Sequence, residues 1–256
     1  GFGSKKIRPD RALLPSESAA INQNWGRWNS PSTFWISNPN NKVVGNTAAG
    51  SQGVGFWMAF QQHGIGSAPP AARTKTPHGF FANNRASSSR IGFTWDGVDQ
   101  LDNPQSEDDR SGQVVQSHYS PRVNASVANS ARTKPEFFGL VAYKNLEAGL
   151  YFRGDAAVFH NSLLVDNGWS LFLAFSQQIK NSVIVGKSEN WSDFDTRALK
   201  RSFFKNGTTA THRRLSGIVT YDGPFELDTV QFHKFSTDRF TIDDGALEID
   251  ATRYPI

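Results

Sequence analysis

Cysteine is absent from the 256 residues of this chain, and methionine occurs once, as Met58. Without cysteine there can be neither a disulfide framework nor a thiolate metal site. No apolar run is long enough to span a bilayer and no signal-peptide pattern opens the chain, so we expect no membrane insertion of this chain. Because the chain starts at Gly1, we interpret it as a processed or truncated product, and an exported form would already have lost its targeting segment.

A large excess of charge of one sign is missing as well, since the net charge is +4 and the isoelectric point about 9.4. Such a mildly basic balance fits ordinary solubility, or a partner that is an acidic polymer. No nucleic-acid-binding module can be recognised, so we expect no nucleic acid partner. An anionic polysaccharide remains the acidic polymer to consider.

The chain does contain an internal repeat of short units rich in Val, Phe, Asn and Gly and punctuated by turn residues, which favours strands over helices. The units occupy residues 44–60, 81–97, 138–154, 159–175 and 179–190, the last resuming at 216–222, with a partial unit at 227–235. The two shortest intervals between unit starts are 21 and 20 residues, which defines one coil. The longer intervals carry insertions at about 61–77, 98–135 and 187–215.

Stacking the units aligns residues into columns, and alternate columns of a strand face opposite sides. Two columns are almost wholly apolar and are expected to face inward: Phe56, Phe93, Leu150, Leu171 and Ile218, and then Met58, Trp95, Phe152, Leu173 and Thr220. Two others must then face outward: Trp57, Thr94, Tyr151, Phe172 and Val219, and then Ala59, Asp96, Arg153, Ala174 and Tyr221. A turn column is expected to form an asparagine ladder: Asn46, Asn83, Leu140, Asn161 and Asn181.

These patterns predict an all-β fold, a right-handed parallel β-helix that is a single-stranded solenoid of the pectate-lyase kind with long inserted loops. We expect an irregular capping segment over residues 1–30, the β-helix over 31–236 and a C-terminal capping segment over 237–256. We expect the chain to be a monomer.

Several segments, in order, resemble the β-helix of the cell-surface hyaluronidase family. They are STFWISNPNNKVVGNTAAGSQGVGFWMAF (32–60), GFFANNRASSSRIGFTWDG (79–97), FFGLVAYKNLEAGLYFRG, IKNSVIVGKSEN and GIVTYDGPFELDTVQFHKF. Fibrocystin-type proteins look like more distant relatives. The resemblance implies an extracellular or cell-surface domain linked to hyaluronan binding or depolymerisation. Its family pattern is matched at Trp57, Asp96, Arg153, Tyr221 and Asp222.

Asp96 and Arg153 share a column in successive coils, so they should lie within ion-pair reach. One interpretation is a structural salt bridge. In the other, Arg153 holds a uronate carboxylate bidentately, Asp96 acts as acid or base, and Trp57 and Tyr151 are stacking platforms on one solvent-accessible face. A polysaccharide lyase needs a cation at the uronate and a base, whereas a glycoside hydrolase usually needs two carboxylates. No hydrolase pair can be assigned, so the cleavage chemistry stays open.

Three further features bear on ligands. His118 and Tyr119 lie in the longest insertion and either fold over the groove to bind substrate or belong to a polar loop with a packed tyrosine. The acidic run 99–110 offers carboxylates for Ca²⁺, although a solvated loop is the alternative. The segment GVGFWM at 53–58 starts like a dinucleotide fingerprint but has Met58 at the third glycine position, so we expect no organic cofactor.

The leading hypothesis is an extracellular, polysaccharide-active β-helix that binds, and as an enzyme depolymerises, an anionic hyaluronan-like glycan. Its candidate catalytic residues are Asp96 and Arg153, and its candidate substrate-binding residues are Trp57, Tyr151, Tyr221, Asp222, His118 and Tyr119. The alternative is a non-catalytic structural, adhesion or carbohydrate-binding β-helix of a larger surface protein.

Overall fold

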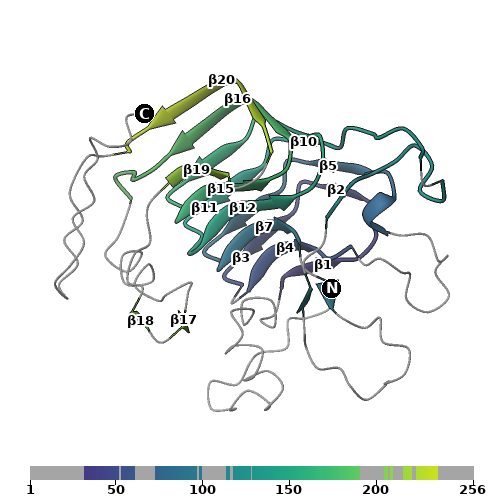
Figure 1. Ribbon diagram of the computed structural model, residues 1–256. Coiled ribbons are helices and arrows are strands. Elements are labelled where there is room, and N and C mark those ends of the chain that lie inside the picture. The colour runs from purple at the N-terminus through teal and green to yellow at the C-terminus, as the bar shows by residue number, and fades with distance from the viewer. Residues whose placement is uncertain are drawn as a thin grey trace, which may run out of the picture.

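The computed structural model describes residues 32–51, 53–60, 73–96, 98–99, 114–115, 118–127, 129–190, 205–206, 208–209, 216–220 and 223–235. Within these ranges the chain is built of β-strands and one 3-10 helix, Arg73–Lys75, with no α-helix (Figure 1). No helix in this part of the chain is long and apolar enough to cross a membrane. The predicted capping segments, 1–30 and 237–256, lie outside the described residues.

The first sheet contains six parallel strands, one from each successive coil. In spatial order they are β1 (Phe34–Ile36), β4 (Val54–Met58), β7 (Ile91–Trp95), β12 (Ala148–Arg153), β15 (Trp169–Ala174) and β19 (Ser216–Thr220). Chain order and spatial order coincide, so each strand pairs with the strand one coil away.

The second sheet holds two further parallel ladders. One consists of β2 (Lys42–Val44), β5 (Phe80–Ala82), β10 (Glu136–Phe138) and β13 (Ala157–His160), and the other of β3 (Thr47–Ala49), β6 (Arg85–Ser87), β11 (Val141–Tyr143) and β14 (Leu163–Val165). The long strands β16 (Gln177–Val185) and β20 (Phe225–His233) pair with each other along both ladders and join them. Two small antiparallel pairs stand apart: β8 (Val98–Asp99) with β9 (Val114–Val115), and β17 (Lys205–Asn206) with β18 (Thr208–Thr209). Three ladders visited in the same order by each coil are consistent with a parallel β-helix.

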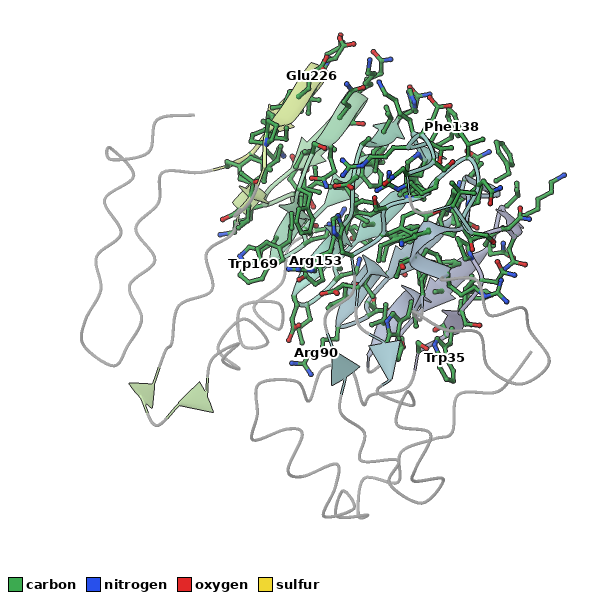
Figure 2. All side chains as sticks on the ribbon, turned by 45° about the vertical axis from the view of Figure 1, so that its right-hand side comes forward. Trp35, Arg90, Phe138, Arg153, Trp169 and Glu226 are labelled. Carbon is green, nitrogen blue, oxygen red and sulfur yellow. The ribbon has the colours of Figure 1, made fainter. Side chains whose placement is uncertain are left out.

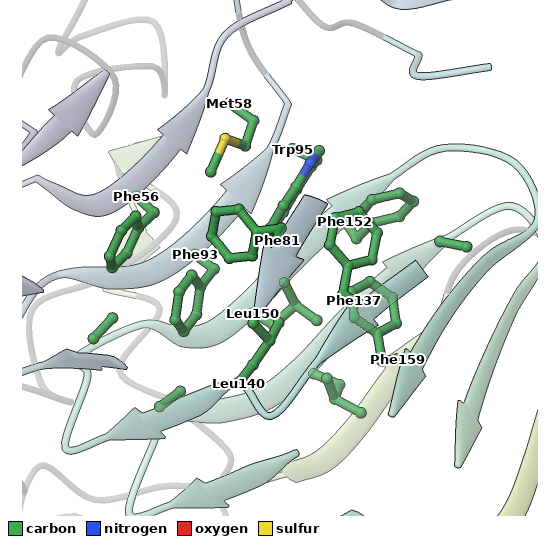
Figure 3. Packing of buried hydrophobic residues seen from close by; sticks show 14 of the residues in the cluster. Phe56, Met58, Phe81, Phe93, Trp95, Phe137, Leu140, Leu150, Phe152 and Phe159 are labelled. Carbon is green, nitrogen blue, oxygen red and sulfur yellow. The ribbon is translucent and has the colours of Figure 1, made fainter. Parts of the chain in front are cut away.

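The core lies between the ladders (Figure 3). The predicted inner row is confirmed, because the register pairs run without a break through Phe34, Phe56, Phe93, Leu150, Leu171 and Ile218. Aromatic rings continue the stack across coils, with ring centroids 4.5 Å apart for Phe34 and Phe56 and 5.1 Å for Phe56 and Phe93. Each buried ring contributes on the order of 1.5–3 kcal/mol by leaving water, so this row is a main source of stability.

The predicted asparagine ladder is wrong at two of its positions. Val44 pairs with Ala82, which sets Asn46 beside Asn84, and the Asn46 side-chain amide donates to Asn84 Oδ1 at 3.1 Å. The column that contains Asn83, Asn161 and Asn181 is completed by Gly45 and Gly139, and all five residues have positive φ. Asparagine and glycine adopt this left-handed conformation most readily. The error arose because neighbouring coils differ in length by one residue at a corner.

A buried polar ladder occupies a different corner, between the third and first ladders. Asn145 Nδ2 donates to Asn167 Oδ1 at 2.9 Å and to the carbonyl of Ala86 at 3.0 Å, while its Oδ1 accepts from the backbone N–H of Ser89 at 3.2 Å. Asn167 in turn donates to the carbonyl of Ala142 at 3.0 Å. These side chains satisfy backbone groups that the corner would otherwise leave unpaired.

Candidate functional site

Asp96 and Arg153 meet at the carboxyl end of two neighbouring strands of the first sheet. The register pairs Trp95 with Phe152, so the next residue of each chain segment is also adjacent. Asp96 Oδ1 lies 3.7 Å from Nε of Arg153, which confirms that the predicted pair is within ion-pair reach. The Asp96 side chain is 0% exposed and that of Arg153 is 13% exposed. The carboxylate is therefore beneath the guanidinium and the guanidinium is the group nearer to solvent.

The outer face of the first sheet is not the open, solvent-accessible face that strand alternation predicted. Trp57 and Tyr151 are both buried, in a second apolar cluster. The cluster consists of Val54, Trp57, Ala59, Ile91, Ala148 and Tyr151, packed with Trp169 and Phe172. The larger side chains of this cluster pack on one another, as when Tyr151 stacks on Phe172 with ring centroids 4.8 Å apart. The indole N–H of Trp57 donates to the backbone carbonyl of Asp96 at 2.8 Å, which ties this cluster to the ion pair.

The long insertion after β7 returns to the first sheet at Tyr119. The backbone N–H of Tyr119 donates to the carbonyl of Arg153 at 3.0 Å, and the N–H of Asp155 donates to the carbonyl of Tyr119 at 2.8 Å. The Tyr119 ring is buried 4.9 Å from that of Phe60, its hydroxyl donates to the carbonyl of Thr76, and burial raises the pKa of the hydroxyl above its ordinary value. Tyr119 therefore packs in the core, which agrees with the second interpretation given for this loop. Its hydroxyl bonds to the backbone and is not positioned as a substrate-binding group.

His118 is placed next to the ion pair through Phe175. The imidazole stacks on the Phe175 ring with centroids 3.9 Å apart, and Cζ of Arg153 lies 5.4 Å from the same ring. The His118 side chain is 41% exposed, and its Nε2 lies 3.0 Å from Oδ1 of Asp155. An accessible imidazole thus stands beside a largely buried arginine on one shared aromatic ring.

Asp155 connects the insertion to the coil. Its carboxylate accepts a hydrogen bond from the Ser120 hydroxyl at 2.7 Å and lies 3.3 Å from the guanidinium of Arg132, besides its contact with His118. The sequence patterns assigned no role to Asp155, Phe175 or Arg132. The one available signal was the position of Asp155 directly after Arg153 and Gly154, at the end of a strand that already carried a candidate.

Two further candidates and the predicted Ca²⁺ loop lie wholly or mostly in parts of the chain that the structure does not describe. Tyr221 and Asp222 lie outside the described residues, as does most of the acidic run proposed for Ca²⁺. Among the described residues no group of three or more His, Asp or Glu side chains could hold a metal ion. The site consists of Asp96, Arg153, Phe175, His118 and Asp155, with Arg132 at its exposed side.

The chain is similar to a known β-helix family and to several known proteins. Residues 8–93 match the family model described as CEMIP beta-helix. The chain is 32% identical over 232 residues to the cell migration-inducing and hyaluronan-binding protein of Homo sapiens, covering 81% of this chain and 17% of that protein. It is 30% identical over 254 residues to the cell surface hyaluronidase CEMIP2 of Homo sapiens, with coverage of 82% and 17%. Fibrocystin-L of Mus musculus is more distant, at 25% identity over 140 residues, 54% of this chain and 3% of that protein.

The resemblance predicted from the sequence is confirmed by these matches. The chain spans about a sixth of the length of the two human relatives. The family-model match includes Trp57 and ends before Asp96 and Arg153, so the grouping of the site residues rests on the geometry described above.

Proposed function

We propose that this chain is an extracellular or cell-surface β-helix that binds an anionic, uronate-containing glycan related to hyaluronan, because residues 8–93 match the CEMIP beta-helix family model. The names of two human relatives, a hyaluronan-binding protein and a cell surface hyaluronidase, support this ligand class. We further propose that the coils wind right-handed, as crossovers between parallel strands nearly always do, and that the chain is a monomer.

The observation that carries the proposal is the setting of Arg153. Its guanidinium is held from beneath by the buried Asp96 carboxylate and from the side by Phe175, and it retains a small exposed surface. A guanidinium fixed in this way is prepared for a bidentate contact with a carboxylate, and little side-chain entropy is then lost on binding. In this proposal Asp96 orients Arg153, and Trp57 and Tyr151 support the pair from behind.

The first test replaces the arginine with lysine. In the Arg153→Lys variant the cation beside Asp96 is kept, so the melting temperature should stay close to wild type, whereas the two-pronged contact is lost. We expect affinity for hyaluronan oligosaccharides, measured by titration calorimetry, to fall about tenfold or more, as for a charge-assisted hydrogen bond of about 1.5–3 kcal/mol.

The matched control is Arg85→Gln, which removes an exposed arginine from β6 on another face of the molecule. It should leave the affinity unchanged. Raising the ionic strength should weaken wild-type binding in the same direction as the Arg153 substitution. An unchanged affinity in the lysine variant, or an equal loss in the Arg85 control, would show that the two-pronged contact at Arg153 does not bind the glycan, and the Arg153 site would be rejected.

A second activity, cleavage of the bound glycan, is favoured by the His118–Asp155 pair. An exposed imidazole that is hydrogen-bonded to a buried carboxylate can move a proton at a substrate bound to Arg153. In elimination a base takes the C5 proton of the uronate, a C4–C5 double bond forms and the C4 oxygen leaves with a proton. In hydrolysis the glycosidic oxygen takes a proton and its bond to the anomeric carbon breaks, while water adds to that carbon and gives up a proton.

Sizing of the products distinguishes these cases from the non-catalytic alternative. Wild-type protein should shorten hyaluronan, and His118→Gln should abolish shortening while leaving most of the binding. Asp155→Asn should reduce the rate by weakening the orientation of His118. Unsaturated uronate in the products, detected by its ultraviolet absorbance, indicates elimination, and saturated products with new reducing ends indicate hydrolysis. If the wild-type protein binds hyaluronan without shortening it, the chain is a binding module and the proposed proton transfer by His118 is rejected.

A further inference from the structure

Trp35 stands out on the first strand of the first sheet because it is 52% exposed, whereas its column neighbour Trp57 is buried. On either side of it in β1, Phe34 and Ile36 pack against the core. One face of the Trp35 ring stacks on Trp57, with centroids 6.0 Å apart and 21° between the planes. Among the described residues no other ring lies on Trp35 and its indole N–H makes no hydrogen bond. The ring is thus a rigid apolar surface held by one face and open on the other.

The same column leads from Trp35 to the site. Register pairs connect Trp35 to Trp57, Trp57 to Thr94 and Thr94 to Tyr151, and Arg153 lies two residues beyond Tyr151 on the same face of β12. Trp35 stacks on the ring of Trp57. The indole N–H of Trp57 donates to the backbone carbonyl of Asp96, the residue whose side chain pairs with Arg153. Figure 2 shows Trp35 at the N-terminal end of the stacked strands and Arg153 farther along the stack. Three strand spacings of about 4.8 Å separate their rows, roughly 14 Å along the axis.

We propose that Trp35 is a second contact point for the glycan, a platform on which the apolar face of a pyranose ring stacks several sugar units away from the unit bound at Arg153. This inference rests on the proposed function, and it adds a consequence for specificity. A chain that reaches both residues is bound at two points, whereas a short fragment is bound at one. The protein should therefore prefer polymers and long oligosaccharides over the short products of their cleavage.

Titration calorimetry with two hyaluronan fragments tests the proposal, a tetrasaccharide and an oligosaccharide of twelve sugars or more, each sized afterwards to show that it is intact. The Trp35→Ala variant should bind the long fragment about three- to tenfold more weakly, the range expected for loss of one ring-stacking contact. Its affinity for the tetrasaccharide should be unchanged. Trp35→Phe keeps an aromatic face and should retain most of the affinity for the long fragment.

The outcomes separate the two proposals. Arg153→Lys should lower the affinity for both fragments. If that variant loses affinity and Trp35→Ala does not, the platform at Trp35 is rejected and the Arg153 site is supported. If Trp35→Ala loses affinity for the long fragment and Arg153→Lys does not, the Arg153 site is rejected and the platform at Trp35 is supported. Equal weakening of both fragments by Trp35→Ala, accompanied by a lower melting temperature in both Trp35 variants, would show that Trp35 only stabilises the first coil. If the wild-type chain binds neither fragment, both proposals fall.

Discussion

At the scale of single residues, burial changes the chemistry of the titratable side chains. His78 is partly buried, and its ring lies 4.5 Å from that of Phe137 and near Phe81 and Tyr119. Loss of hydration disfavours the charged imidazolium, so the pKa of His78 is lowered from 6.5 to about 4, although the contact with the carbonyl of Gly79 opposes this. The neutral ring therefore acts as a core aromatic in the folded chain.

This setting predicts a pH-dependent loss of stability. The unfolded chain binds a proton at His78 more tightly than the folded chain does, so the free energy of unfolding should fall as the pH drops from about 6.5 toward 4. The contribution is on the order of 2–3 kcal/mol. Urea melts at pH 7 and pH 4.5 should show a smaller difference for His78→Gln than for wild type. His233→Gln, an exposed residue in β20, is the control and should keep the wild-type difference.

The residue scale also shows what strand alternation can and cannot predict. The alternation in β7 and β12 correctly brought Asp96 next to Arg153, because register is set by the apolar residues that precede them. Strand alternation predicts which face of the sheet a side chain lies on, but not whether that face is exposed to solvent. The burial of Trp57, Asp96 and Tyr151 was therefore not predicted. The contacts of His118 with Phe175 and Asp155 join an insertion to a coil, and a non-periodic insertion leaves no pattern to align.

At the scale of elements, the three ladders and the corners between them follow different rules. Inside the first sheet the predicted row from Phe56 to Ile218 holds without exception, since a shift of one residue would turn every apolar side chain outward. At the corners, coils gain or lose a residue, which is why Asn46 aligns with Asn84 while Phe56 aligns with Phe93. The sequence could therefore predict strands and their register within a ladder, but not the alignment of the corners.

The buried corner ladder should matter for stability. In Asn145→Ala the N–H of Ser89 and the carbonyl of Ala86 lose their partners inside the molecule. A buried group left unpaired costs about 1–3 kcal/mol, so we expect a total loss of roughly 2–4 kcal/mol in the free energy of unfolding. Denaturant melts measure it, and Asn46→Ala, at the less buried corner of the first coil, should cost clearly less. Equal costs would show that the ladder does not depend on burial.

At the scale of the whole molecule, the described strands of the two large sheets pair only with strands of adjoining coils, so stability should vary along the stack. The middle strands β7, β12 and β15 have neighbours on both sides and a closely packed core. The terminal strand β20 pairs with β16, and its Phe225 and Leu227 are among the exposed large hydrophobic residues. The molecule should therefore open from its ends.

Amide hydrogen exchange tests this gradient. Protection should be highest in β7, β12 and β15 and lowest in β1 and β20, since local opening at an end disrupts one interface and opening in the middle disrupts two. Phe152→Ala, which removes a fully buried ring, should cost about 3–5 kcal/mol and reduce protection in the neighbouring coils. Phe80→Ala, at an exposed ring, is the control. Uniform protection in all these strands would contradict the gradient.

The pairing of Tyr119 with Gly154 has a consequence for how such proteins diversify. Arg153 and Asp96 belong to the repeating scaffold, whereas His118, Ser120 and Arg132 arrive on an insertion that rejoins the scaffold through two backbone hydrogen bonds. Deletions, grafts and changes of length are tolerated in a surface insertion far better than within the strands of a coil. Under the proposed function, a lineage can thus keep the part of the site that lies on the coils while it gains, exchanges or loses the part that carries the imidazole, and proteins that bind the glycan and proteins that cleave it would then differ by one insertion.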